Sequence, residues 1–87
     1  MSDLRTIPGV GKSIEQDLFN IGIKQISDLK GKIPEDLYKQ DCQFKGYKDD
    51  LCLLYVFRLA VYFAENEELE PEKLKWWYWK DKKYPST

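Results

Sequence analysis

The sequence contains no histidine, and its only cysteines are Cys42 and Cys52. Histidine is the commonest general base and a frequent metal ligand, and no serine, cysteine or lysine stands in a recognisable activated setting. Nine residues separate the two cysteines, which fits no known zinc spacing. We therefore predict that the protein is not an enzyme and holds no metal or cofactor.

Long apolar segments and a secretory leader are also missing from the sequence. The longest apolar stretch, residues 51–64, is too short to span a bilayer and contains Arg58. We expect a cytoplasmic protein without membrane contact, in which Cys42 and Cys52 are free thiols. Cys52 is expected to be an ordinary core residue, whereas Cys42 would pair reversibly with it if the loop at Gly46 brings the two sulfur atoms together.

An excess of positive charge is the next absence. The 87 residues contain 14 basic and 15 acidic side chains, a net charge of −1. Any affinity for nucleic acid must therefore be local. The acidic run at residues 65–72 is interpreted as a solvated helix end, since hard-cation loops hold their ligands more tightly, and five lysines follow it in residues 73–83.

Apolar residues recur at helical spacing almost throughout the chain, which predicts an all-α fold. We expect a single compact domain of about five helices over residues 1–81, with a flexible tail at residues 82–87. Helices are expected near residues 2–6, 13–21, 26–30, 34–43 and 51–64, with a last helix or turn from residue 71.

Particular residues mark where these helices begin and end. Pro8 stops the first, Gly22, Gly31 and Gly46 end later ones, and Pro34 suits a first helical turn. Ser13 and Gln16 have capping-box spacing, and Asp49 offers a cap to the helix after it.

Residues 51–64 are apolar around nearly the whole helix circumference. A helix of this kind is central and buried, so we expect the others to pack around it. Arg58 would then reach the edge of the domain or pair with a carboxylate.

The segment Ile7-Pro8-Gly9-Val10-Gly11-Lys12-Ser13 is the feature most suggestive of function. Its two glycines permit a tight turn with positive φ and close approach of a ligand. The helix that follows begins with amide groups lacking intrahelical partners, at the positive end of its dipole, where an anion is stabilised. Ile7 and Val10 are expected to anchor the turn to the core.

This segment resembles the helix-hairpin-helix family, whose members hold the DNA backbone through such a turn. The resemblance implies a helix-hairpin-helix or SAM-like architecture and phosphate contacts at the hairpin. The neighbouring lysines Lys24, Lys30 and Lys32 are candidates for further phosphate contacts. The residues implied are Gly9, Val10, Gly11, Lys12 and Ser13. The family usually has alanine four residues after the second glycine, where this chain has Glu15. Either the two helices splay or Glu15 turns outward.

A wider resemblance covers most of the chain. It includes Ile26-Ser27-Asp28-Leu29-Lys30-Gly31, Pro34-Glu35-Asp36-Leu37-Tyr38, Leu54-Tyr55-Val56-Phe57-Arg58 and Lys75-Trp76-Trp77. With these segments the chain resembles the small bacterial proteins of the pathogenicity locus or mitomycin-resistance family. The resemblance implies the same helical fold and a bacterial cytoplasmic protein.

Four consecutive aromatic residues, Trp76, Trp77, Tyr78 and Trp79, lie between lysines. They cannot all face inward from one short element, so we expect Trp77 and one neighbour to pack on the central helix. Trp76, Tyr78 and Trp79 are the candidates for a partner surface, with self-association as its first use.

The sequence thus leaves three hypotheses for function. The leading one is a nonspecific nucleic-acid backbone-binding module, for DNA in preference to RNA, that acts weakly through Gly9, Val10, Gly11, Lys12 and Ser13. The alternative is a protein-interaction or adaptor domain that uses the aromatic C-terminal surface. A thiol-dependent resistance or redox factor is the third.

Overall fold

The computed structural model describes residues 3–84, and this part of the chain is helical and contains no strand. It has three α-helices and four short 3-10 helices, where about five helices were predicted. In chain order they are η1 (Asp3–Thr6), α1 (Lys12–Asn20), η2 (Ile26–Leu29), α2 (Pro34–Lys45), α3 (Leu51–Glu65), η3 (Pro71–Leu74) and η4 (Trp76–Lys80). The all-α prediction is confirmed, and Ser2, expected in the first helix, lies outside the described residues.

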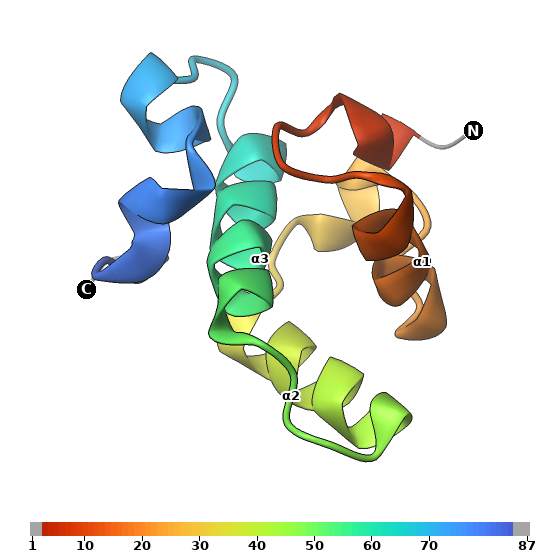
Figure 1. Ribbon diagram of the computed structural model, residues 1–87. Helices are drawn as coiled ribbons and strands as arrows, with labels where there is room; N and C mark the ends of the chain where they lie inside the picture. Colours follow the sequence, from red (N-terminus) through yellow and green to blue (C-terminus); the bar gives the residue numbers. More distant parts are fainter. Residues whose placement is uncertain (1–2, 85–87) are drawn as a thin grey trace.

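Helix α3 runs through the middle of the molecule, as its apolar circumference predicted (Figure 1). The segment η1–α1 and helix η2 lie on one side of α3, η3 and η4 lie on the other, and α2 packs near its beginning. Ten of its fifteen residues are buried. The radius of gyration is 11.7 Å, close to the value of about 12 Å expected for a folded domain of this length.

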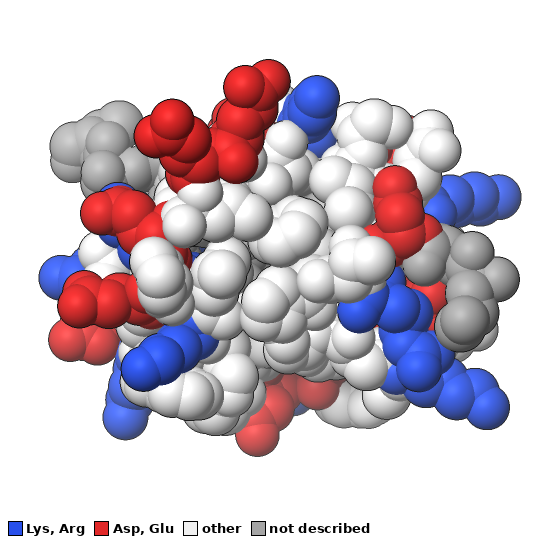
Figure 2. All heavy atoms as spheres, turned by 90° about the horizontal axis from the view of Figure 1, so that it is seen from above, with Lys and Arg blue, Asp and Glu red and all other residues white. Residues whose placement is uncertain are grey.

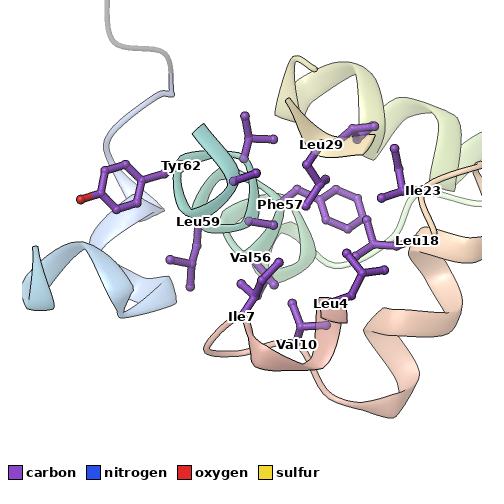
Figure 3. Close-up of a cluster of buried hydrophobic side chains, with 14 of the residues drawn as sticks. Leu4, Ile7, Val10, Leu18, Ile23, Leu29, Val56, Phe57, Leu59 and Tyr62 are labelled. Atoms are coloured by element: carbon purple, nitrogen blue, oxygen red, sulfur yellow. The ribbon is translucent and has the colours of Figure 1, made fainter. Parts of the chain in front are cut away.

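The main core lies between α3 and the N-terminal elements (Figure 3). Leu4, Leu18 and Phe57 have no exposed side-chain area, and Ile7 and Val10 come from the turn between η1 and α1. Full burial of an aliphatic or aromatic side chain stabilises a fold by about 1.5–3 kcal/mol. The turn is therefore a structural part of the core as well as a surface loop.

Two predicted helix caps are wrong. Gly11 is the N-cap of α1 and no side chain caps this end, while Gln16 donates to Asn20 one turn later, at 3.0 Å, instead of forming a capping box. Helix α3 is capped by Asp50, which accepts from the amide of Cys52 at 3.0 Å. The expected cap, Asp49, is instead engaged by Lys45.

The ends of α2 follow the predicted rules, with one shift in position. Pro34 occupies the first turn, where its missing N–H has no intrahelical partner to lose. Gly46 ends the helix in the left-handed conformation, with φ of 79°. The helix reaches Lys45, two residues past the expected end at Gln43.

The C-terminal segment packs on α3 through a different aromatic residue from the one expected. Trp79 is 4% exposed and Trp77 is 56% exposed, so the prediction that Trp77 packs inward is wrong. The reason is that η4 is a 3-10 helix, in which residues three apart share a face. Trp76 and Trp79 therefore point toward the body of the protein, and Trp77 points away.

Several contacts hold Trp79 in place. Its ring centroid lies 5.4 Å from that of Tyr62 and 5.7 Å from that of Tyr84, and its indole N–H donates to the carbonyl of Lys73 at 2.9 Å. Tyr84 is half-buried and its hydroxyl donates to Glu65 at 2.8 Å. Packing thus continues to Tyr84, within the segment expected to be a tail, and residues 85–87 lie outside the described part.

Arg58 pairs with a carboxylate, as expected for a charge on a buried helix. Its Nε and Nη2 donate to Glu35 Oε2 at 3.0 and 2.9 Å, and its Nη1 donates to the carbonyl of Trp79 at 2.7 Å. The one side chain therefore ties α3 to the start of α2 and to η4.

Candidate functional site

The turn between η1 and α1 is fixed by its own backbone and by two buried side chains. The amide of Ile7 donates to Leu4 O and that of Val10 donates to Ile7 O, both at 3.1 Å. The side chains of Ile7 and Val10 are 1% and 5% exposed, as the sequence predicted. The amide of Val10 is consequently engaged within the turn, and its side chain is inside the core.

Only one of the two glycines of the turn uses the conformational freedom of glycine. Gly9 has φ of 87°, in the left-handed region, whereas Gly11 has φ of −98°. A Cβ atom at Gly9 would lie 3.8 Å from Leu59 Cδ2 and 3.9 Å from the Trp76 side chain. The C-terminal segment therefore lies against the turn that the sequence singled out.

The first turn of α1 leaves a set of backbone donors open. Glu15 is the first residue of α1 whose backbone amide donates a hydrogen bond, to Gly11 O at 2.9 Å. Within residues 3–84, no hydrogen bond engages the amides of Gly11, Lys12, Ser13 and Ile14. Gly11, Lys12 and Ser13 are exposed, so these donors and the Lys12 ammonium are accessible to an anion.

Glu15 does not turn outward, which removes one of the two expectations for this position. It is 8% exposed, and its carboxylate lies 3.7 Å from Arg5 Nη1. The side chain of Glu15 is thus directed from α1 toward η1. The pairing with Arg5 offsets the negative charge that this residue places near the turn.

The additional lysines proposed for phosphate contact are exposed but not all close to the turn. Lys24 follows Gly22, beyond the carboxyl end of α1, a helix roughly 13 Å long at 1.5 Å per residue. Lys30 and Lys32 flank Gly31 after η2. In the view from above in Figure 2, charges of both signs surround an uncharged centre.

The residues expected to form a partner surface differ in their exposure to solvent. Trp76 and Tyr78 are half-buried and Trp79 is buried, so Trp79 is not available to a partner. Trp77, which the sequence assigned to the core, is the exposed member, and the Lys75 ammonium lies 5.9 Å from its ring centroid.

A cleft of about 400 Å³ next to the turn was not foreseen from the sequence. Its lining extends from Gly9, Ser13 and Trp76 to Asp17, Lys45 and Asp49. Together with the buried Asp41, these three residues form what we define as the charged cluster. Lys45 Nζ lies 3.2 Å from Asp17 Oδ1 and 3.4 Å from Asp41 Oδ2, and it also pairs with Asp49. Asp41, Lys45 and Asp49 are four residues apart in sequence, a spacing that could have indicated part of the cluster, whereas Asp17 comes from the distant helix α1.

The charged cluster shifts the ionisation of its members in opposite directions. Burial raises the pKa of Asp41 to about 6, reinforced by its neighbour Asp49 and opposed by Lys45. The hydrogen bond from Lys45 lowers the pKa of Asp49. Burial works to lower the pKa of Lys45, but hydrogen bonds to Asp49 and Asp17 outweigh it and raise this pKa. The cluster thus contains more negative charge than one ammonium neutralises.

Both cysteines are free thiols, and one lies in an unexpected place. Cys52 is exposed beside the cleft, so the prediction that it is a core residue is wrong; it occupies the first turn of α3, before that helix enters the core. Cys42 is half-buried, and its Sγ accepts from the amide of Asp49 at 3.3 Å. Desolvation and the hydrogen bond with Asp50 raise the pKa of the Cys52 thiol.

Comparison with known proteins places the chain in a family. No helix within residues 3–84 is long and apolar enough to cross a membrane. No solved structure matches the chain. The chain is 35% identical over 78 residues to the Mitomycin resistance protein McrB of Streptomyces lavendulae. The aligned region covers 90% of this chain and 70% of that protein. Residues 1–84 match the family described as Pathogenicity locus. The chain therefore belongs to the Pathogenicity locus family.

Proposed function

We propose that the protein is a nonspecific nucleic-acid backbone-binding module, for DNA in preference to RNA. The observation that carries this proposal is the open start of α1, where the amides from Gly11 to Ile14 have no hydrogen-bond partner among the described residues. Lys12 adds an exposed charge at the same place. A phosphate oxygen satisfies such donors and is favoured by the helix dipole.

In this proposal η1, the turn and α1 form a helix-hairpin-helix unit. The order of elements and the buried anchors Ile7 and Val10 support this interpretation, as does the left-handed Gly9. Gly9 and Val10 act through the shape of the turn, whereas Gly11, Lys12 and Ser13 supply the contacts. The unit would therefore hold one or two phosphates without reading bases.

The expected affinity is low, because a chain of net charge −1 provides little attraction beyond the site itself. Contacts of this kind give dissociation constants of about 10⁻⁴ to 10⁻⁶ M, and each neutralised phosphate contributes a slope of about −0.9 to log K against log salt. A shallow salt dependence would thus distinguish local phosphate capture from binding by a broad basic surface.

The test is a titration of the 15N-labelled protein with short duplex and single-stranded DNA at low and moderate salt. We expect the amides of Gly11, Lys12 and Ser13 to shift, and Lys12→Ala to weaken binding equally for unrelated sequences. Lys39→Ala, at an exposed lysine of α2, removes the same charge elsewhere and controls for nonspecific attraction. If the three amides do not move at low salt, the proposal is wrong.

A second candidate function is protein interaction through the C-terminal surface. The 56% exposure of Trp77 favours it, since large exposed aromatic residues often anchor interfaces. The form that commits to a partner is self-association, which Trp77→Ser should weaken. Light scattering over a range of concentrations tests this form, and a strict monomer contradicts it.

A further inference from the structure

We propose that the carboxylates of Asp17, Asp41 and Asp49 form a binding site for a hard divalent cation, at which the Lys45 ammonium is a competing occupant. One oxygen from each aspartate lies within 4.8 Å of the other two. The three side chains come from three segments of the chain, so a bound ion would link α1, α2 and the loop before α3. The proposal is independent of phosphate binding at the turn.

The spacing of the oxygens suits a single ion. Two ligands on opposite sides of an ion are separated by twice the metal–oxygen distance, which is about 4.2 Å for Mg²⁺ and about 5 Å for Ca²⁺. The 4.8 Å limit among the three carboxylates falls within the range for Ca²⁺ and needs only a small closure for Mg²⁺. Carboxylate oxygens select these ions and Mn²⁺ over softer metals.

Asp41 provides the observation that points to a missing ligand. Its side chain is fully buried, and neither oxygen accepts a hydrogen bond from any residue in the described range. Lys45 Nζ lies 3.4 Å from Oδ2, and Oδ1 has no hydrogen-bond donor among the described residues. Buried carboxylates are ordinarily paired or bound to a metal, because an unsatisfied buried charge is costly.

Lys45 only partly neutralises this cluster. Three ionised aspartates and one ammonium sum to −2. Once Lys45 has left, the three carboxylates carry −3, of which one divalent ion balances two charges. Lys45 is the last residue of α2 and its side chain is 20% exposed, so the ammonium can turn into the cleft and solvent. The same side chain that stabilises the ion-free protein therefore weakens binding of the ion.

The most exposed boundary of the site, the loop before α3, is held in position by its backbone. The Tyr38 hydroxyl donates to the carbonyl of Asp49, and the Asp49 amide donates to Cys42 Sγ at 3.3 Å. These contacts fix the Asp49 main chain from both sides without using its carboxylate. The ligand set is thus preorganised in the absence of an ion, as a specific site requires.

The test is calorimetric titration of chelator-treated protein with Ca²⁺, Mg²⁺ and Mn²⁺, in the absence of nucleic acid. We expect saturable binding of at least one ion, weakened at least about tenfold by Asp41→Asn. Lys45→Gln should tighten binding by about tenfold, because it removes the competing charge. Asp36→Asn, at an exposed aspartate of α2, is the matched control and should change nothing.

Tighter binding by Lys45→Gln is the decisive result, since a purely structural ion-pair cluster predicts only loss of stability for this variant. Circular dichroism establishes that each variant is folded. For the unaltered protein, Mn²⁺ should broaden the amide resonances of Asp17 and Asp49 before those of Asp36. Absence of saturation up to about 10 mM, beyond the weakest protein calcium sites, in both the unaltered protein and Lys45→Gln overturns the proposal, as does broadening that begins elsewhere.

Discussion

Replacing Arg58 by alanine should detach the C-terminal segment from the central helix and destabilise the protein by about 2–4 kcal/mol. The guanidinium is in a buried residue, 7% exposed, and donates to the carbonyl of Trp79 at 2.7 Å. Removing the donor leaves that carbonyl without its partner, which costs about 1–3 kcal/mol. Loss of the packed aliphatic stem adds about 1 kcal/mol.

The ion pair with Glu35 contributes little to this figure. The Glu35 side chain is 39% exposed, so water replaces much of what it loses when the guanidinium is removed. Glu35→Gln should therefore cost less than about 1 kcal/mol, because Arg58 still reaches the carbonyl of Trp79. Arg58→Met, which keeps most of the volume, should cost less than Arg58→Ala.

Urea unfolding followed by far-UV circular dichroism measures these free energies of unfolding. The indole N–H resonance of Trp79 in the 15N-labelled protein, which donates to the carbonyl of Lys73, reports separately on the environment of Trp79 and should shift in the folded Arg58→Ala variant. The reasoning is refuted if Arg58→Ala costs no more than Glu35→Gln. It is also refuted if Arg58→Ala is destabilising but leaves the environment of Trp79 unchanged.

Three further predictions concern the turn, the aromatic segment and the charged cluster. Gly9→Ala should lower the free energy of unfolding by about 1–2 kcal/mol, because φ at Gly9 is 87° even though a Cβ atom has room there. Gly11→Ala should cost less than about 1 kcal/mol. Chemical denaturation compares the two variants, and equal costs would contradict the assigned turn. Trp79→Leu should cost about 2–3 kcal/mol and Trp77→Leu within about 0.5 kcal/mol in the same assay, and a larger loss at Trp77 would reverse the assignment. With chelator present, raising the pH from 4 to 6 should lower the free energy of unfolding of the unaltered protein by about 2 kcal/mol more than that of Asp41→Asn. The raised pKa of Asp41, about 6, means that the folded state binds this proton more tightly than the unfolded chain, so stability is lost as the proton leaves. Parallel pH profiles for the two proteins would contradict this.

The features that were predicted correctly are those encoded by residues close together in the sequence. Apolar residues around the whole circumference of residues 51–64 can be satisfied only inside the protein, and α3 is central. Pro34 and Gly46 impose their backbone conformations wherever they occur, and they delimit α2. Ile7 and Val10 are the large apolar residues of the turn, and both are buried.

The features that the sequence missed depend on distant parts of the chain. Cys52 has core-like chemistry but lies in the first turn of α3, where the cleft leaves it exposed. Trp77 and Trp79 differ in burial because the segment forms a 3-10 helix, a choice imposed by its packing on α3. Asp41 and Asp49 are each four residues from Lys45, but their meeting with Asp17 depends on the packing of α1 on α2, for which the sequence carried no signal.

The turn and the aromatic segment, which the sequence presents as sites for two different functions, are parts of one structure. Arg58 holds the carbonyl of Trp79, and η4 in turn places Trp76 where a Cβ on Gly9 would touch it at 3.9 Å. The turn thus packs against the core through Ile7 and Val10 and lies close to Trp76 at Gly9. The position of the open amides of α1 consequently depends on the last helix as well as on residues 3–22. A partner that displaced η4 would alter the proposed phosphate site, and phosphate bound at the turn would in turn favour the docked state of η4.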